Sequence, residues 1–170
     1  EGCAVDIASR DGDALDRVAT EIIADVPGAD IRVHVADLSS SEDQEALFEA
    51  CRDVDILINN AGAAASGSLV ETDETGWRNS WDLKVFGYIN LSRAFCRVMK
   101  DRADGVIVNI IGYAGERLNS RYIIGTTGNA ALMAFTQSAG SESPDFGVRI
   151  VGVNPGFTRT DRAEDQLKTF

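Results

Sequence analysis

Two short segments of the sequence carry side chains that could bind a small polar ligand. An apolar segment at residues 54–58 runs into two amides, an alanine and a glycine at residues 59–62. Elsewhere a hydroxyl and a guanidinium stand together, in Ser9 and Arg10. An arginine offers a planar fork of donors that matches the oxygens of a phosphate, so this pair favours a phosphorylated ligand. Asp11 weakens that prediction, and a solvated turn is the alternative interpretation of Arg10.

Alternating strand-like and helix-like segments must position these residues. Strands are expected where apolar residues are continuous or alternate with polar ones, at residues 4–8, 31–36, 56–59, 106–110 and 148–153. Helical periodicity predicts helices at residues 11–25, 76–100 and 129–139. A capping box at Ser41 and Gln44 predicts one more, through Ala50. This order is typical of an α/β fold with a parallel sheet and helices on both faces.

The composition is that of one ordinary globular domain spanning residues 1–170. Of its residues 44% are hydrophobic and 25% are charged, which allows a substantial apolar core. The net charge of -11 opposes binding to nucleic acid or to anionic membranes. No apolar run approaches the roughly 20 residues of a membrane helix, and no signal-peptide pattern opens the chain. We therefore expect a soluble, cytoplasmic protein without nucleic-acid or membrane partners.

The residues that commonly ligate metals are scattered along the chain. Cys3, Cys51 and Cys96 are odd in number and lie outside any Cys-x-x-Cys spacing, so we expect reduced thiols and no zinc site. The single histidine, His34, lies in an apolar alternation and is interpreted as a half-exposed strand residue. Acidic residues stand in the first turns of the expected helices, where they suit the helix dipole. The sequence therefore predicts no metal site.

The segment at residues 59–62, Asn-Asn-Ala-Gly, resembles a signature of the short-chain dehydrogenase/reductase family. Two weaker similarities stand around it in the family's order, Asp37-Leu38 and Pro155-Gly156. The resemblance covers nearly the whole chain and implies a Rossmann-like, doubly wound sheet of order 3-2-1-4-5-6 that binds a nicotinamide cofactor. The family's first strand and glycine-rich turn have no counterpart. We therefore expect part of a longer polypeptide, in which the second and fourth family strands lack their shared neighbour.

The resemblance also implies a set of cofactor contacts. An acidic side chain at the end of the family's second strand favours NAD, whereas Ser9 and Arg10 at that place favour NADP, with NAD as the alternative. The carboxylate of Asp37 would accept a hydrogen bond from the adenine. The implied cofactor-binding residues are Ser9, Arg10, Asp37, Leu38, Asn60, Ala61, Gly62, Ile110, Pro155, Gly156, Phe157 and Thr160.

The family's catalytic residue types are absent from their usual places. The family uses a Tyr as general acid and base, a Lys that lowers its pKa, a Ser that holds the substrate oxygen, and a supporting Asn. A gapless match puts Gly112 at the Ser, Gly125 at the Tyr and Asn129 at the Lys. The same match puts Lys84 at the Asn. Lysine and asparagine have thus exchanged places, so Lys84 is predicted to return the missing positive charge. A lysine with its head in water is the alternative.

Tyr122 is the predicted source of the phenol. It lies three residues before Gly125, on the same helix face and about 4.5 Å away along the axis. An insertion after Tyr122 would instead align it with the family's Tyr and put Thr126 at the Lys, an arrangement that still needs the charge of Lys84. Tyr113 is a second candidate. Packing is the alternative role for both tyrosines.

Together these features predict an NADP(H)-dependent oxidoreductase acting on a small carbonyl or alcohol, with Tyr122, Lys84 and Asn129 at its catalytic site. The alternative is a catalytically inactive NAD(P)-binding regulatory or scaffold protein, and an isomerase, epimerase or lyase is a third. The resemblance further implies a homodimer or homotetramer paired through the helices at residues 76–100 and 129–139.

Overall fold

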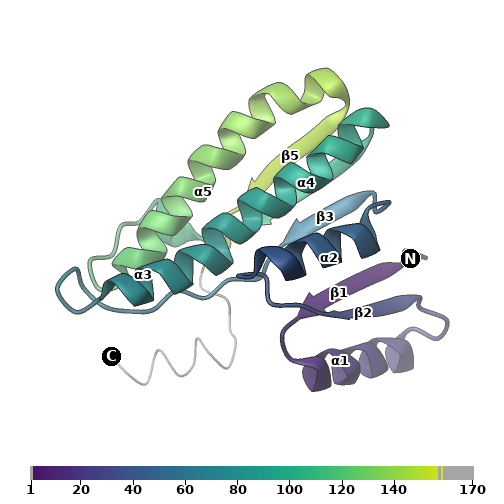
Figure 1. Ribbon diagram of the computed structural model, residues 1–170, viewed down its shortest axis with the longest axis horizontal. Helices are drawn as coiled ribbons and strands as arrows, with labels where there is room; N and C mark the ends of the chain where they lie inside the picture. Colours follow the sequence, from purple (N-terminus) through teal and green to yellow (C-terminus); the bar gives the residue numbers. More distant parts are fainter. Residues whose placement is uncertain (1, 157, 159–170) are drawn as a thin grey trace.

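The strands in the described part of the chain form two separate parallel sheets (Figure 1). The computed structural model describes residues 2–156 and 158. One sheet pairs β1 with β2, and the other has the order β3-β4-β5. Their bounds are β1 Val5–Ser9, β2 Ile31–Val35, β3 Ile56–Asn59, β4 Gly105–Ile110 and β5 Val148–Val153. Within the described residues β1 and β3 are paired neither with each other nor with a common strand.

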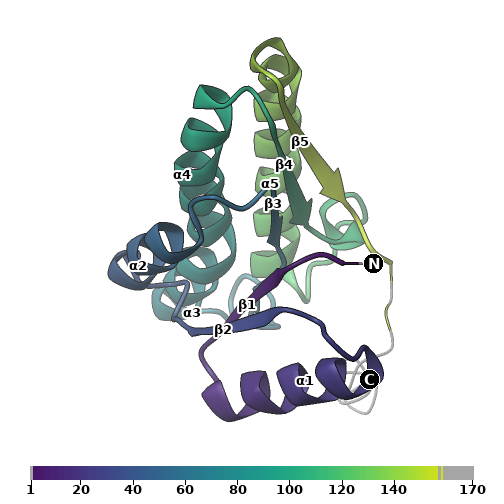
Figure 2. The same cartoon turned by 90° about the vertical axis from the view of Figure 1, so that its right-hand side faces the viewer.

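Helices lie on opposite sides of the strands, and on the second side the described helices cover only the β1–β2 pair (Figures 1 and 2). Figures 1 and 2 show α2, α4 and α5 on one side of the strands and α1 against the other side of the β1–β2 pair. The predicted α/β arrangement is therefore confirmed. The helical bounds are α1 Gly12–Asp25, α2 Ser41–Cys51, α3 Glu74–Trp81, α4 Gly87–Asp101 and α5 Ile123–Glu142, with short 3-10 turns at Tyr113–Gly115 and Ser143–Phe146.

The main apolar core lies between α4 and the β3–β4–β5 sheet. Phe95 and Met99 of α4 pack in one cluster with Ile107 of β4 and Val148 of β5, and each of the four is at most 1% exposed. Burying side chains of this size contributes about 1.5–3 kcal/mol each. The other side of this sheet carries Ile58, which is 60% exposed within the described part of the chain. The described helices therefore enclose this sheet from one side.

The N-cap of α2 lies one residue earlier than the sequence predicted. Ser40, not Ser41, is the N-cap, and its Oγ accepts a hydrogen bond from the Asp43 N–H at 3.4 Å. Gln44 is buried instead of capping, and its side-chain amide donates to the Leu38 carbonyl at 2.7 Å. Two serines precede the helix and a third is its first residue, so three consecutive hydroxyls were available as caps.

The long helix predicted at residues 76–100 is interrupted. α3 leads into a π-helical turn, Asp82–Phe86, before α4 continues the helical path. A π turn widens the helix locally and is found frequently at functional sites. The turn holds Lys84, which the sequence singled out for its chemistry.

The last helix begins at Ile123, six residues before the predicted start at residue 129. Glycines at 125 and 128 lowered the predicted helicity there, because glycine is a poor helix former. In the structure both glycines serve close packing. A Cβ atom on Gly128 would lie 3.3 Å from Cγ2 of Val85. Tertiary contact therefore outweighs intrinsic propensity at the start of α5.

Candidate active site

Lys84 reaches from the π turn to the end of β4. Its Nζ donates a hydrogen bond to the carbonyl oxygen of Ile111 at 2.6 Å. Its alkyl stem lies across Gly62, where an added Cβ would approach Lys84 Cδ to 2.9 Å. Real Cβ atoms do not come this close, so Gly62 leaves the room that the stem occupies. The ammonium is therefore held at the carboxyl end of the sheet by backbone on one side and by its packed stem on the other.

Tyr122 lies at the N-terminus of α5, and its ring covers Gly125. A Cβ atom on Gly125 would overlap the Cζ and Cε1 atoms of the Tyr122 ring, and it would lie 2.5 Å from the phenol oxygen. The phenol thus fills the space into which a side chain at position 125 would project. The phenol oxygen therefore lies close to where the side chain of residue 125 would begin.

The loop before Tyr122 is fixed by main-chain hydrogen bonds. Gly67 N–H donates to Arg121 O at 2.8 Å, and Ile123 N–H donates to Gly67 O at 3.4 Å. The hydroxyl of Thr126 is buried and accepts from the Asn119 N–H at 3.3 Å. Thr126 therefore contributes to holding this loop, and the phenol is positioned by segments from two parts of the chain.

Asn129 is buried one turn further along α5, beside Gly112. A Cβ atom on Gly112 would lie 3.1 Å from Asn129 Nδ2, and the φ of Gly112 is +127°, a conformation that disfavours any other residue. The Oδ1 of Asn129 accepts no hydrogen bond from the described residues. A buried acceptor without a donor costs about 1–3 kcal/mol, so a bound hydroxyl or amide N–H at this point would be stabilising.

The other two tyrosines are placed differently. The Tyr88 hydroxyl donates to the Ile110 carbonyl at 2.9 Å, and burial raises the pKa of this phenol well above its usual range. Tyr88 is thus a packed core residue that holds the end of β4. Tyr113 is 43% exposed, its N–H donates to Pro155 O at 3.0 Å, and the Arg117 guanidinium lies 6.0 Å from its ring centroid. Tyr122 alone of the three covers Gly125.

An open depression lies at the carboxyl end of β1. Its lining is Ser9, Arg10, Asp11, Gly12 and Asp13. The carboxylate of Asp11 caps α1 by accepting from the Ala14 N–H at 2.9 Å, so it is engaged away from the guanidinium. The first turn of a helix and the exposed Arg10 favour an anion at this end of β1, whereas the carboxylate of Asp13 in the same lining opposes one.

Asp37, the residue expected to contact the adenine, is already engaged at the end of β2. Its Oδ1 accepts from both the N–H and the hydroxyl of Ser39, at 2.9 and 2.7 Å. Its Oδ2 lies 3.9 Å from Nη1 of Arg10. These hydrogen bonds, with a smaller contribution from the Arg10 charge, lower the pKa of Asp37. The carboxylate stays ionised and can still accept a further donor from the open side.

Asn60, Ala61 and Gly62 leave the end of β3, and Pro155 and Gly156 follow the end of β5. Parallel strands bring these ends to one edge of the sheet, where ligands bind in open α/β folds. The predicted cofactor residues Phe157 and Thr160 lie outside the described residues.

A family model described as short chain dehydrogenase matches residues 1–169. The chain belongs to the short-chain dehydrogenase family. Galactitol 2-dehydrogenase (L-tagatose-forming) of Cereibacter sphaeroides is 33% identical over 162 residues, which cover 94% of this chain and 63% of that enzyme. The chain thus spans less than two thirds of the length of this relative.

Two solved structures share the fold over nearly the whole chain. One is an NADPH-bound short-chain oxidoreductase from Pseudomonas aeruginosa PAO1 containing an atypical catalytic center, with a TM-score of 0.89 and 26% identity over 99% of this chain and 67% of that one. The other is a short-chain dehydrogenase from Sphingobium yanoikuyae in complex with NADPH, with a TM-score of 0.90 and 27% identity over 99% and 68%. The predicted Rossmann-like fold is therefore confirmed.

Sequence reasoning missed a buried polar network beneath the site. Asn59 donates to Asn109 Oδ1 at 2.9 Å and to Ser92 Oγ at 3.0 Å, and Asn109 donates to Thr136 Oγ1 at 2.9 Å. The network joins β3, β4, α4 and α5. The sequence signals this network only by an asparagine near the end of β3 and another near the end of β4. The register of these strands places Asn59 beside Asn109.

No described helix is both long enough and apolar enough to cross a membrane.

Proposed function

We propose that the protein is an NADP(H)-dependent oxidoreductase that interconverts a small carbonyl and its alcohol, with Tyr122 as the proton donor and Lys84 as its electrostatic partner. The observation that carries the proposal is the ring of Tyr122 lying over Gly125. The family match expects a tyrosine at position 125, where this chain has a glycine. The Tyr122 ring brings a phenol next to that position, which supports acid–base chemistry by Tyr122.

The residues present fit a nicotinamide cofactor at two points. The buried, unpartnered Oδ1 of Asn129 could accept a hydrogen bond from a hydroxyl or a carboxamide N–H. Ser9 and Arg10 line the depression at the end of β1, where a guanidinium could pair with a phosphate. When bound, the nicotinamide would supply or accept the hydride. The remaining predicted contacts, among them Asp37 and Gly62, would hold the cofactor along the edge of the sheet.

In the direction of reduction, the Tyr122 hydroxyl would hydrogen-bond to the substrate carbonyl oxygen and transfer its proton as negative charge develops there. The Lys84 ammonium favours the phenolate that remains, because a cation close to an acid stabilises the ionised form. The side-chain amide of Asn129 would orient the bound cofactor by accepting a hydrogen bond from it. In the direction of oxidation the same groups act in reverse, with the phenolate taking the proton of the alcohol.

The relatives support the coarse substrate class and the unusual site. A galactitol 2-dehydrogenase is among them, which fits an alcohol or carbonyl substrate. The Pseudomonas aeruginosa oxidoreductase combines bound NADPH with an atypical catalytic center, so an unusual site is compatible with cofactor binding in a related fold.

One observation favours the inactive alternative. Gly112 has no side chain to hold a substrate oxygen, and Asn129 carries no charge. A protein that retained only the cofactor site would use NADPH as a ligand in a regulatory or scaffold role. It would bind NADPH and turn over no carbonyl compound.

The deciding experiment uses the full-length protein. NADPH binding is measured by fluorescence, and NADPH oxidation is followed with a panel of small aldehydes and ketones. Tyr122→Phe should reduce kcat by about 100-fold or more, within the range for a lost general acid, while NADPH binding is retained. Lys84→Met should have a similar effect. Lys100→Met is the matched control for Lys84→Met, because Lys100 is exposed in the last turn of α4. Tyr113→Phe tests the second candidate for the phenol.

Full activity in Tyr122→Phe would refute the catalytic assignment. Binding without turnover in the unaltered protein would support the inactive alternative, and no binding of either nicotinamide cofactor would refute both functions.

The oligomeric state of the protein is a second proposal. We propose a homodimer or homotetramer formed through α4 and α5, on the basis of the family resemblance. Light scattering of the full-length protein at several concentrations would reveal a monomer if this proposal is wrong.

A further inference from the structure

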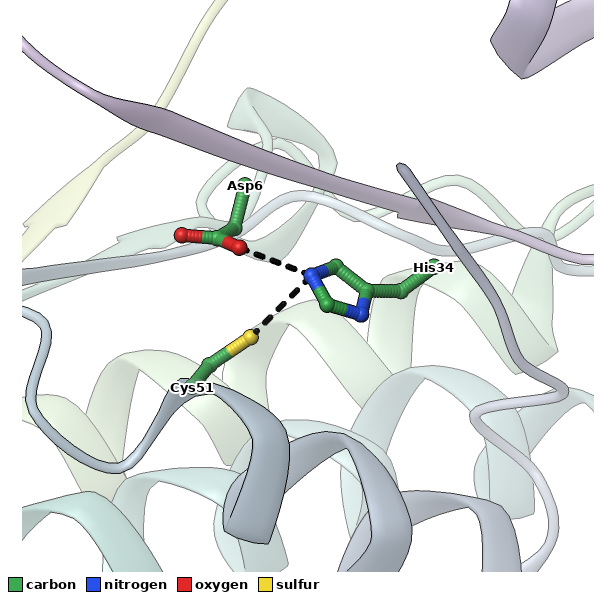
Figure 3. Close-up of side chains that lie close together, drawn as sticks. All are labelled: Asp6, His34 and Cys51. Carbon is green, nitrogen blue, oxygen red and sulfur yellow. Dashed lines mark hydrogen bonds and ion pairs between the residues drawn. The ribbon is translucent and has the colours of Figure 1, made fainter. Parts of the chain in front are cut away.

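Three different elements bring a carboxylate, an imidazole and a thiol to one point, away from Tyr122 and Lys84. Asp6 comes from β1, His34 from β2 and Cys51 from the last turn of α2, as Figure 3 shows. In the parallel register Asp6 lies opposite Arg32, and His34 lies opposite Ala8. Asp6 and His34 are therefore diagonal neighbours on the same face of the pair, and α2 places Cys51 over that face.

The contacts converge on a single ring nitrogen. His34 Nε2 lies 2.7 Å from Asp6 Oδ1 and 3.5 Å from Cys51 Sγ. All three ligand atoms lie within 4.8 Å of one another. A thiol, imidazole and carboxylate acting as a nucleophilic relay would need both ring nitrogens, one for each partner. Because both partners meet Nε2, this arrangement does not fit such a relay.

The same convergence suits a cation. Without an ion, Asp6 can accept one hydrogen from Nε2 of His34 and one from the thiol of Cys51. A cation in place of these two hydrogens would attract all three groups at once. One nitrogen, one oxygen and one sulfur form the mixed set of ligands that a borderline-soft divalent ion such as Zn²⁺ accepts, with ligand bonds of about 2.0–2.3 Å.

The surroundings support three protein ligands and one open position. Cys51 is 7% exposed, the Asp6 side chain is 10% exposed, and the His34 side chain is 23% exposed, so water can reach the imidazole side. Asp6 Oδ2 pairs with Nη2 of Arg32 at 2.9 Å, which leaves Oδ1 for the ion and orients the carboxylate. The Arg32 side chain is 54% exposed, and water therefore screens its charge from the site.

We propose that Asp6, His34 and Cys51 bind Zn²⁺, with a water molecule as the fourth ligand, and that the ion ties the β1–β2 sheet to α2. On binding, the Cys51 thiol loses its proton to solvent and coordinates as the thiolate. The sequence predicted no metal site because the ligands are 28 and 17 residues apart, spacings that match no metal motif. The proposal does not depend on the oxidoreductase function.

Cobalt spectroscopy tests the site in the full-length protein. The protein is treated with a chelator, dialysed and titrated with Co²⁺, which takes tetrahedral zinc sites and absorbs visibly. We expect a sulfur-to-cobalt charge-transfer band that Zn²⁺ removes by competition. Cys51→Ser should abolish the band, and His34→Gln should weaken Co²⁺ binding by about 100-fold or more, since even loss of an outer partner costs 10–100-fold. Cys96→Ser is the matched control, because Cys96 is a partly buried cysteine outside the cluster.

A charge-transfer band that survives Cys51→Ser, or no band in the unaltered protein, would overturn the proposal. A second measurement needs no variant. Zn²⁺ should slow the alkylation of Cys51 in the native protein, followed by peptide mass spectrometry, and should leave the alkylation of exposed Cys3 unchanged. Equal rates with and without Zn²⁺ would equally count against the site.

Discussion

The β3–β4–β5 sheet and the β1–β2 sheet differ in what lies against them. The three-stranded sheet has fully buried apolar side chains beneath α4 and a buried amide network near its carboxyl end. The two-stranded sheet has α1 on one face, where Leu15 and Ala19 are the buried apolar residues of the helix, and a charged and polar cluster on the face toward α2. The first sheet and its buried contacts would support the proposed active site. The second carries the polar groups for which we propose cofactor selection and metal binding.

The largest expected effect tests which of the two sheets contributes more to the free energy of unfolding. Phe95→Ala should lower the free energy of unfolding by about 3–5 kcal/mol, because Phe95 is fully buried and its ring meets Phe48 edge-on at 5.2 Å. Leu15→Ala in α1 should cost about 2 kcal/mol, the low end for such a truncation. Urea unfolding of the full-length protein measures both. A cost for Leu15→Ala as large as that for Phe95→Ala would break the comparison.

The buried amide network should be the next most sensitive feature. Asn109→Ala removes the acceptor of Asn59 and the donor to Thr136, and leaves buried polar groups unpaired at a cost of about 1–3 kcal/mol. The same urea titration applies. Asn79→Ala, at an exposed amide in α3, is the matched control and should change stability by less than about 0.5 kcal/mol. Equal effects of the two variants would mean that the network contributes little.

A change in the β1–β2 half should alter cofactor choice without altering turnover. Arg10→Gln removes the guanidinium at the end of β1 and should reduce the preference for NADPH over NADH by about tenfold, or about 1.4 kcal/mol. The ratio of kcat/KM for the two cofactors measures this. Arg17→Gln, on the exposed side of α1, should leave the ratio unchanged. A fall in kcat for Arg10→Gln at saturating NADPH would contradict the separation of roles.

The smallest expected effect concerns the thiols of the metal-free protein. Burial, and then the negative charge of Asp6, raise the pKa of Cys51 from its ordinary value of 9.0 to about 11, while Arg32 acts in the opposite direction. Since the thiolate is the reactive form, iodoacetamide at pH 8 should modify exposed Cys3 well before Cys51. Mass spectrometry over time gives both rates. Equal rates in the native protein would show that the cluster is open.

The sign of the accompanying stability change follows from the same shift. Below pH 9 the Cys51 thiol keeps its proton in both the folded and the unfolded chain. Between pH 9 and about 11 the unfolded thiol ionises while the folded one does not, so stability should fall as the pH rises through this range.

The order of elements was predictable because apolar periodicity follows from which side chains must be buried. The strands at residues 56–59 and 148–153 were predicted with their observed bounds, and the helix at residues 11–25 differs by one residue. Caps and irregular turns were not predictable, because neighbouring serines offer equivalent hydroxyls and a π turn leaves the apolar spacing of a helix almost unchanged. In the structure Gln44 donates to the Leu38 carbonyl instead of capping, and Val85 of the π turn lies against Gly128.

The candidate site was only partly within reach of the sequence. The exchange of Lys84 and Asn129 can be seen by matching residues to the family. The orientation of the Tyr122 ring cannot, because it depends on the space above Gly125. The cluster of Asp6, His34 and Cys51 was likewise invisible, since each residue alone has an ordinary structural explanation and only the register of β1 and β2 brings them together.

The overlap between the Tyr122 ring and the space above Gly125 constrains how this protein can evolve. A tyrosine introduced at 125 would compete for a volume already filled, and a glycine introduced at 122 would empty it. Position 125 can therefore accept a larger residue only if the residue at 122 changes as well, so we expect the two positions to be energetically coupled. The double change should cost less stability than the sum of the two single changes.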